Sequence, residues 1–311
     1  MPRTPLAPNE NNRKRAVDKP SSHDRAGRRQ FLRRAAVATT GFAAGFTRLT
    51  TVEVSAPLPG PEQPKRLLLI GGPFDGHPKG SHEYMAGLSI LARCLEGVPA
   101  LETRVTNSEE PWRDGPAMID SADGVVLFRE QGARFIQGEP VRLEAFERLA
   151  QRGGGCVALH FGLGTVEAKF IERFVNLFGA CHGGPDRRTH TATVKLAFGA
   201  ASHDVCRGLN GFQVHDEVYF KLKRAAPGPE ITPLVQAEIE GRSEMVGWVW
   251  QRGNGGRSFG FSGLHYHENW RLAAYRRLVT QGILWTLRLP VPKGGINVDV
   301  LASLLELRNT P

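Results

Sequence analysis

Four short stretches of the sequence carry the side chains best suited to chemistry, and each lies beside an apolar run. Their histidines, carboxylates and tyrosines are the groups that proteins use to move protons and to hold divalent metals. Each stretch also contains glycines, which allow the backbone to turn sharply. The stretches are GGPFDGHPKGSHEY (71–84), GGGCVALHFGLG (153–164), HDVCRGLNGFQVHDEVYF (203–220) and FGFSGLHYHEN (259–269).

The first stretch brings Asp75, His77 and His82 to the start of a predicted helix. Its glycines match neither a phosphate-binding loop nor a dinucleotide fingerprint, so no nucleotide cofactor is predicted. In the first turn of a helix the positive end of the dipole lowers a histidine pKa, which favours the neutral form that binds metals. We predict His82 as a metal ligand and Asp75 as a substrate contact. The alternative is that His82 only marks the helix start.

The second stretch predicts a sharp turn from a strand into a helix, with His160 at the turn. In amidotransferases and α/β-hydrolases such an elbow presents a nucleophilic cysteine or serine. Here the only nearby thiol, Cys156, falls inside the strand. An imidazole can bind a metal or move a proton but is a poor acyl acceptor. We predict His160 as both a catalytic residue and a metal ligand.

The third stretch reads as a strand, in which alternation places His215, Glu217 and Tyr219 on one face and Asp216 on the other. We predict Glu217 and Tyr219 as catalytic acid and base groups or substrate contacts, and His215 as a substrate-binding residue. The alternative is a solvated turn before an edge strand.

The fourth stretch delivers His265 at the end of a strand, with His267 two residues later. Residues at this spacing share a side in an extended chain, so both imidazoles can face one site. His265 is predicted to be catalytic and to bind metal, whereas His267 is predicted to bind substrate or to cap the last helix. The sequence therefore predicts a centre at His82, His160 and His265 that either holds a divalent metal, zinc or a similar ion, or moves protons.

The elements that must position these side chains alternate between short apolar strands and amphipathic helices. This alternation predicts an α/β fold with a mostly parallel sheet and helices on both faces, in which ligands bind outside the carboxyl ends of the strands. The second half of the chain is richer in strand patterns. Strands are predicted at residues 66–72, 100–106, 122–128 and 156–161, and helices at 81–97, 139–155, 166–179 and 269–287.

The chain divides into four parts by composition. Residues 1–55 are polar and then weakly apolar, and are predicted to be a disordered N-terminus followed by an export signal. Residues 56–65 form a Pro-rich linker. Residues 66–290 are predicted to form one α/β domain, and residues 291–311 a C-terminal tail.

The export signal is predicted from a twin arginine, Arg28-Arg29, one residue before Phe31-Leu32. A weakly apolar run follows at residues 35–46 and is too short to span a bilayer. The pattern resembles a twin-arginine signal, which exports proteins that have already folded. It predicts a periplasmic or cell-envelope location, with membrane attachment only through an uncleaved signal. The alternative is a basic amphipathic N-terminal helix.

The charge distribution argues against a nucleic-acid-binding protein, and the cysteine spacing excludes two cysteine motifs. Residues 1–55 hold 11 Lys and Arg against 4 Asp and Glu, and the remaining residues hold 29 against 27. The predicted domain is thus close to neutral, and no nucleic-acid partner is predicted. The chain has no C-x-x-C pair, which excludes a zinc ribbon and a thioredoxin-like motif. Its four cysteines are scattered, and Cys94 and Cys156 are expected to be buried thiols.

These motifs, in this order, resemble those of the ThuA-like (trehalose utilisation) family of the class I glutamine amidotransferase-like superfamily. The resemblance covers about residues 66–290 and is carried by GSHEYMAGLSILARCLE, ADGVVLF, GGGCVALHFGLG, HDVCRGLNGFQVHDEVYF and GRSFGFSGLHYHENW. Glutaminases of the superfamily carry cysteine at the elbow, and histidine then glutamate two residues later on a late strand. Here His160 stands at the elbow and His267 follows His265, so glutaminase activity is not predicted.

The resemblance implies a flavodoxin-like three-layer α/β/α sandwich, a role in disaccharide or keto-sugar catabolism, and a divalent metal at the histidines. We therefore expect an exported carbohydrate isomerase or hydrolase with a sugar substrate, and a homo-oligomer is left open. The alternative is a non-catalytic domain on the same fold that binds a sugar or a protein partner. In that case aromatic side chains would stack on the sugar, from among Trp248, Trp250, Trp270 and Tyr266.

Overall fold

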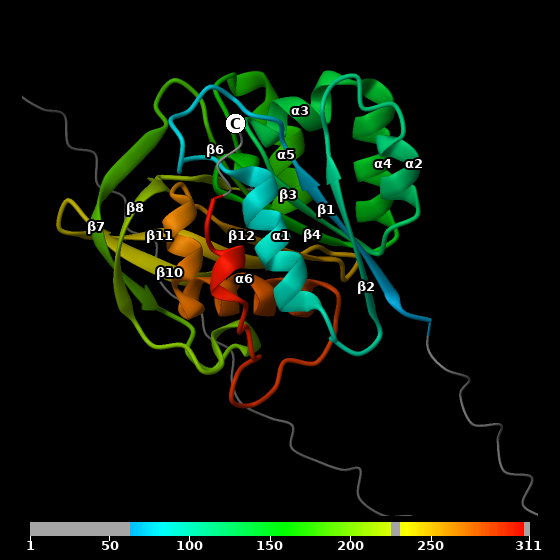
Figure 1. The fold of residues 1–311 in the computed structure, drawn as a ribbon. Coiled ribbons are helices and arrows are strands. Elements are labelled where there is room, and N and C mark those ends of the chain that lie inside the picture. The colour runs from blue at the N-terminus through cyan, green and yellow to red at the C-terminus, as the bar shows by residue number, and fades with distance from the viewer. Residues whose placement is uncertain (1–62, 225–230, 308–311) are drawn as a thin grey trace, which may run out of the picture. The chain divides into compact units, whose positions relative to one another are not determined.

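A single large sheet organises the part of the chain that the computed structural model describes, residues 63–224 and 231–307. Within these residues nine strands lie in the order β2-β1-β3-β4-β12-β11-β10-β7-β8 (Figure 1). They are β1 (Lys65–Gly71), β2 (Leu101–Asn107), β3 (Gly124–Phe128), β4 (Gly155–Leu159), β7 (Arg188–Phe198), β8 (Phe212–Phe220), β10 (Thr232–Ile239), β11 (Arg242–Gln251) and β12 (Arg257–Phe261).

The sheet is mixed, which corrects the expectation of a mostly parallel sheet. The five strands from β2 to β12 in the sheet order pair in parallel, whereas β11, β10, β7 and β8 extend the sheet by antiparallel pairing. Short connections join β10 to β11 and β11 to β12, and connections of that length can link only antiparallel neighbours. The predicted α/β class is confirmed.

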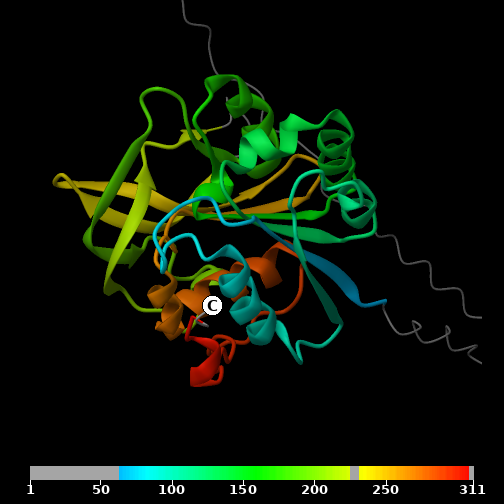
Figure 2. The ribbon, with the colours of Figure 1, turned by 45° about the horizontal axis from the view of Figure 1, so that its top comes forward.

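Helices cover both faces of the sheet, as Figure 2 shows with the sheet seen nearly edge-on. The helices α1 and α6 pack on one face, and α2, α3, α4 and α5 pack on the other. Their bounds are α1 (Tyr84–Leu95), α2 (Gly115–Asp120), α3 (Gly132–Gly138), α4 (Pro140–Gln151), α5 (Ile171–Phe178) and α6 (Ala273–Thr286). The four helices predicted from periodicity are present, while the short α2 and α3 were not predicted.

Alternation along the strands accounts for the two cores. In β1, Leu67 and Leu69 pack against α1 and α6, while Leu68 and Ile70 pack on the opposite side with the other helices. Successive strand residues point to opposite faces, so a strand buried on both faces is a continuous apolar run. The run RLLLIGG at the start of the domain thus encodes a central strand.

A small second sheet lies beside the carboxyl end of β4. It consists of β5 (Gly164–Thr165), β6 (Ala180–Gly183) and β9 (Lys223–Arg224). The strand predicted at 156–161 ends at Leu159, because His160 begins a short 3-10 turn at 160–163. This turn leads directly into β5 and produces the predicted elbow.

The cysteines and tryptophans singled out in the sequence are core residues. All four cysteines are buried free thiols. Trp248, Trp250 and Trp270 are at most 7% exposed, so they cannot stack on a ligand at the surface. Of the four aromatic residues considered for that role, only Tyr266 is partly exposed.

The ends of the chain are described only in part. The predicted N-terminus with its export signal lies outside the described residues, as do residues 56–62 of the linker. Among the described residues, no helix is both long and apolar enough to span a membrane. The C-terminal tail packs on the domain through Val291 and Val298, both buried.

Candidate functional site

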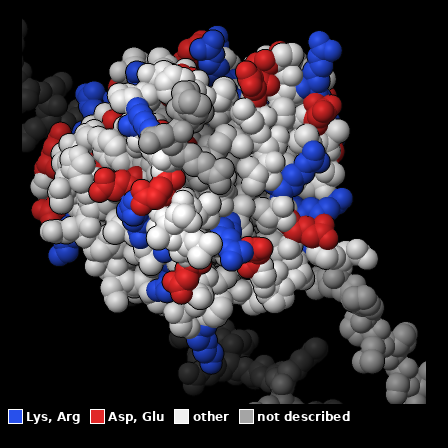
Figure 3. All heavy atoms as spheres, viewed as in Figure 1, with Lys and Arg blue, Asp and Glu red and all other residues white. Residues whose placement is uncertain are grey.

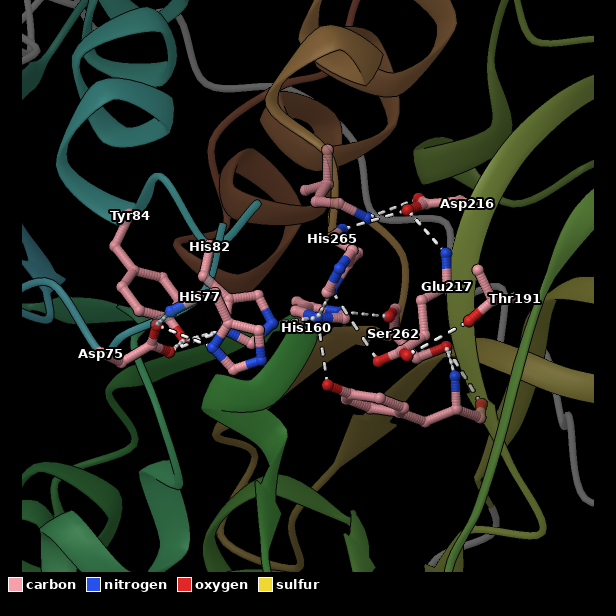
Figure 4. A network of polar contacts seen from close by, with 12 residues as sticks. Asp75, His77, His82, Tyr84, His160, Thr191, Asp216, Glu217, Ser262 and His265 are labelled. Carbon is pink, nitrogen blue, oxygen red and sulfur yellow. Dashed lines mark hydrogen bonds and ion pairs between the residues drawn. The ribbon is translucent and has the colours of Figure 1, made fainter. Parts of the chain in front are cut away.

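The predicted histidines meet at the carboxyl edge of the parallel half of the sheet (Figure 4). His160 follows β4, His82 lies in the loop between β1 and α1, and His265 follows β12. Because β1 and β12 are both close to β4 in the sheet, residues far apart in sequence converge at this edge. The prediction that these three residues lie together at strand ends is therefore confirmed.

The centre of the cluster is Nε2 of His160. It lies 3.0 Å from Nε2 of His82 and 3.1 Å from Nδ1 of His265. The hydroxyl of Tyr219 on β8 is 3.0 Å from the same nitrogen. Three side chains from three separate elements thus point at one atom of the elbow histidine.

Both His82 and His160 adopt left-handed backbone conformations, with φ values of 54° and 45°. Such values are uncommon for residues other than glycine and concentrate at functional sites. At His160 the following Gly162 makes the turn possible, since a side chain there would collide with the carbonyl of Leu127 in β3. The elbow is therefore a built feature that aims the His160 ring into the cluster.

Asp75 sets the tautomer of His82. One of its carboxylate oxygens lies 2.7 Å from Nδ1 of His82 and accepts a hydrogen bond from the Tyr84 hydroxyl at 2.7 Å. Burial acts to raise the pKa of Asp75, but the hydrogen bonds from His82 and Tyr84 outweigh it, so the net pKa is lowered. An ionised carboxylate can only accept, so Nδ1 of His82 must carry a proton. When His82 is neutral, its Nε2 therefore has no proton and carries a lone pair.

The backbone sets the tautomer of His160 in the same way. Nδ1 of His160 lies 2.9 Å from the carbonyl oxygen of Ser262, just after β12. A carbonyl only accepts, so Nδ1 donates and Nε2 carries the lone pair. The lone pairs of His82 and His160 therefore face each other at 3.0 Å, which is repulsive unless a cation or an additional proton lies between them.

The electrostatics favour neutral imidazoles. Burial, followed by the neighbouring His82 and His265, lowers the pKa of His160 well below its usual value. Burial, followed by His82 and His77, lowers the pKa of His265 to about 4. At neutral pH these two rings are therefore unprotonated, which is the form that binds metals.

The donor set fits a divalent transition metal. A tetrahedral zinc ion with Zn–N bonds of about 2.0–2.1 Å separates its nitrogen ligands by about 3.3 Å. The two separations found at His160, 3.0 and 3.1 Å, are close to that value. His82, His160 and His265 can each offer one nitrogen to a common ion. Asp75, His77 and His82 form an overlapping group, but Asp75 already holds Nδ1 of His82.

Tyr219 and Glu217 lie on the other side of the cluster from Asp75 (Figure 4). The Tyr219 ring is stacked between His160 and His182, with centroid distances of 4.7 and 3.9 Å. Burial and the charge of Glu217 raise the pKa of Tyr219 well above its usual value, so its hydroxyl remains a donor. Glu217 lies 3.8 Å from Nδ1 of His265 and accepts a hydrogen bond from Thr191 on β7.

Asp216 has a role that strand alternation did not reveal. Its carboxylate is fully buried and accepts hydrogen bonds from the backbone N–H groups of Leu264 and His265 and from the Tyr275 hydroxyl. Burial raises the pKa of Asp216 to about 6 against the effect of these donors, so it is still ionised at neutral pH. Asp216 points away from Glu217, as predicted, but it anchors the loop that carries His265.

The structure gathers most of the predicted site residues but not all. His82, His160, His265, Glu217 and Tyr219 surround one point, and Asp75 joins them as the partner of His82. The exposed His215 instead stacks on Tyr266, at a centroid distance of 5.6 Å. His267 is buried and is not among the residues that could share one metal ion. The catalytic, metal-binding and substrate-binding roles assigned to these residues stay predictions.

Sequence reasoning missed Tyr84, His182, Asp216 and Ser262. His182 is buried, and burial together with Arg187 lowers its pKa to about 3. Ser262 acts through its backbone carbonyl, a group that every residue has, so the sequence could not reveal this role. Asp216 carried one usable signal, since a carboxylate among apolar strand residues is rarely buried without several hydrogen-bond donors.

The sequence matches the pattern of one protein family. The pattern of the ThuA family, described as trehalose utilisation, matches residues 74–286. No curated protein matches the chain.

Two solved structures share the fold. One is a protein described as ThuA-like from Parabacteroides merdae, with 19% identity, a TM-score of 0.55, and coverage of 72% of this chain and 90% of the other. The second, described in the same way, comes from Bacteroides uniformis, with 13% identity, a TM-score of 0.55, and coverage of 74% and 95%.

Proposed function

Since the chain belongs to the ThuA family of trehalose utilisation, we propose that it is an exported enzyme of carbohydrate catabolism. Its substrate is a disaccharide or keto-sugar, and its reaction is an isomerisation or a hydrolysis at the centre formed by His82, His160 and His265. A small-molecule sugar is the partner that this proposal requires.

The proposal rests on one observation: the Nε2 lone pairs of His82 and His160 face each other. Asp75 and the carbonyl of Ser262 hold the two rings in these tautomers. His265 adds a third nitrogen 3.1 Å from Nε2 of His160. Two rings with fixed tautomers and a third imidazole nitrogen beside them support a metal-binding centre better than a simple polar core, because a buried polar cluster without a cation would pair its donors with acceptors.

A divalent metal bound there would polarise the carbonyl of a sugar substrate as a Lewis acid. Glu217 stands beside His265 with a partly exposed side chain, where it can take a proton from the carbon next to that carbonyl. Tyr219 keeps its proton at neutral pH and, in place of its hydrogen bond to Nε2 of His160, can donate one to a substrate oxygen. Asp75 and Asp216 hold His82 and the His265 loop in place.

Two other activities are less well supported. Amidotransferase chemistry needs a nucleophile at the elbow, but His160 occupies that position and Cys156 is fully buried within β4. A sugar-binding module without catalysis was suggested by the tryptophans, and Trp248, Trp250 and Trp270 are buried in the core.

The proposal is tested by the metal content of the purified protein, after reloading with zinc or manganese. We expect about one ion per chain, as for a three-histidine site. The variants His160→Ala and His265→Ala should lose the ion, whereas His190→Ala, a histidine on β7 outside the cluster, should retain it.

The same preparations should be assayed against trehalose and oxidised disaccharides. Turnover that disappears in His160→Ala but persists in His190→Ala is the expected result. If the reloaded wild-type protein holds no metal, and all variants treat sugars alike, the metalloenzyme proposal is wrong.

A further inference from the structure

A cleft of about 730 Å³ opens next to the histidine centre, and His265 lies in its wall. We propose that this cleft binds the second ring of a neutral disaccharide while the first ring lies at the histidines. This inference rests on the proposed function, since it assumes that the reacting sugar is at the centre. It adds the location of a subsite and the class of ligand.

The floor of the cleft is a short antiparallel pairing of two loops. His82 N–H donates to the carbonyl of His265 at 3.0 Å, and His267 N–H donates to the carbonyl of Gly80 at 2.8 Å. Ser81 and Tyr266 form the bridge between these two bonds. The same pairing therefore positions His82 and His265, two of the proposed metal ligands, and also forms part of the cleft wall. A ligand bound in the cleft consequently lies next to the histidine centre.

His267 gives the cleft a buried hydrogen-bonding group that is incompletely paired. Its side chain lines the cleft and the residue is 4% exposed. Neither ring nitrogen makes a side-chain hydrogen bond of ordinary geometry among the described residues, and a backbone contact with Leu305 only partly offsets the effect of burial, which lowers the pKa of His267. Buried polar groups in native structures nearly always have full hydrogen-bond partners, so this incompletely paired imidazole in the cleft wall is suited to a ligand hydroxyl. A sugar can supply both a donor and an acceptor to such a ring.

The charges around the cleft favour a neutral ligand. Lys79 and Arg271 are balanced by Glu268 and Glu306. Arg271 and Glu306 also pair with each other at 2.5 Å across the cleft wall. A site that selects a phosphate or a carboxylate carries an excess of positive charge, and this cleft has none. Neutral polyols are instead recognised by mixed donors and acceptors of this kind.

Tyr266 supplies an apolar surface at the same place. Its ring packs edge-on against His265 with a centroid distance of 4.6 Å and stacks on His215 at 5.6 Å. It is partly exposed and lines the cleft. An aromatic ring with one polar end suits the mixed surface of a sugar ring. The volume also lies within the range of about 300–1,000 Å³ that is typical of small-molecule sites.

The test is isothermal titration of the full chain with trehalose, glucose and glucose 6-phosphate. We expect trehalose to bind about ten-fold more tightly than glucose, because it gains the contacts of a second ring. Glucose 6-phosphate should bind no more tightly than glucose. His267→Phe, which keeps a ring of similar shape, and Tyr266→Ala should each bring trehalose affinity close to that of glucose, without changing glucose affinity.

Val141→Ala, an exposed apolar residue on α4, is the control and should behave like the wild type. Tyr266→Ala changes a partly exposed residue, so it remains informative if His267→Phe lowers the melting temperature. Equal affinity for trehalose and glucose, or a loss for both sugars in the two variants, would overturn the proposed subsite. Metal content measured on the same samples separates this result from a failure of the metal centre, because a metal-free protein that still prefers trehalose supports the subsite alone.

Discussion

The orientation of single imidazole rings decides what the centre can do. His82 and His160 each have one nitrogen occupied by an acceptor outside the cluster, Asp75 in one case and the Ser262 carbonyl in the other. Partners of this kind fix the tautomer and direct the second nitrogen toward a ligand, as they do around metal-bound histidines in general. The cluster is thus organised by residues that do not themselves face its centre.

Tyr219 is the residue for which a role in metal binding can best be distinguished from a role in the reaction. Its hydroxyl donates to Nε2 of His160, the same lone pair that a metal would use. Tyr219→Phe removes that competing donor and keeps the ring between His160 and His182. We expect zinc affinity, measured by competition with a chelating dye, to stay the same or rise. Sugar turnover should fall about 100-fold or more if the hydroxyl acts as an acid.

The measurement distinguishes three roles for Tyr219. A ten-fold or greater loss of zinc affinity, following the range typical of direct or outer-shell partners, would show that the hydroxyl is itself a ligand. Unchanged turnover would show that it takes no part in the reaction. Thr191→Val, which removes a hydroxyl that bonds to Glu217 at the exposed edge, is the matched control for losing a nearby hydroxyl group.

At the scale of elements, the elbow depends on close packing of backbones. His160 turns sharply after β4, and the next residues pass directly over β3 and the start of α3. The Cα of Gly162 faces the carbonyl of Leu127, and that of Gly132 faces the carbonyl of Gly162. Backbone atoms cannot move aside as a flexible side chain can, so both positions require glycine.

The substitution Gly162→Ala should therefore destabilise the protein by about 3 kcal/mol, at the upper end of the usual cost of overpacking. It should also weaken metal binding, because the His160 ring moves with its backbone. Gly253→Ala is the matched control, since a methyl group there meets nothing and the backbone is not left-handed. Urea denaturation of the two variants gives the comparison, and equal stabilities would show that the elbow tolerates a side chain.

The sequence predicts the elements better than the contacts between them. Apolar runs located the strands, and the rule that ligand-binding residues lie at strand ends predicted that His82, His160 and His265 are close together. Periodicity could not give the strand order, so the antiparallel extension through β11, β10, β7 and β8 was missed. Strand alternation correctly placed Asp216 on the face of β8 opposite Glu217. It could not show that the backbone of the His265 loop binds the Asp216 carboxylate there.

At the scale of the whole molecule, the distribution of charge distinguishes residues 1–55 from the rest of the sequence. The face seen in Figure 3 carries acidic and basic side chains interspersed, in keeping with the near balance of 29 Lys and Arg against 27 Asp and Glu after residue 55. The excess positive charge of the chain lies within residues 1–55. A basic N-terminal segment before a nearly neutral remainder is consistent with the proposed export signal and gives no support to nucleic-acid binding by the rest of the chain.

We predict that the N-terminal segment directs export of the whole protein. Fusing residues 1–60 to a reporter that folds in the cytoplasm should send the reporter to the periplasm of a bacterium with a twin-arginine system. The double change Arg28→Lys and Arg29→Lys should retain it in the cytoplasm, because lysine keeps the charge but not the planar guanidinium that such recognition uses. Cell fractionation measures the result. The matched control, Arg33→Lys with Arg34→Lys, makes the same change four residues beyond the pair and should export normally. If both double variants behave alike, the N-terminal segment acts only through its charge, and the twin-arginine assignment is wrong.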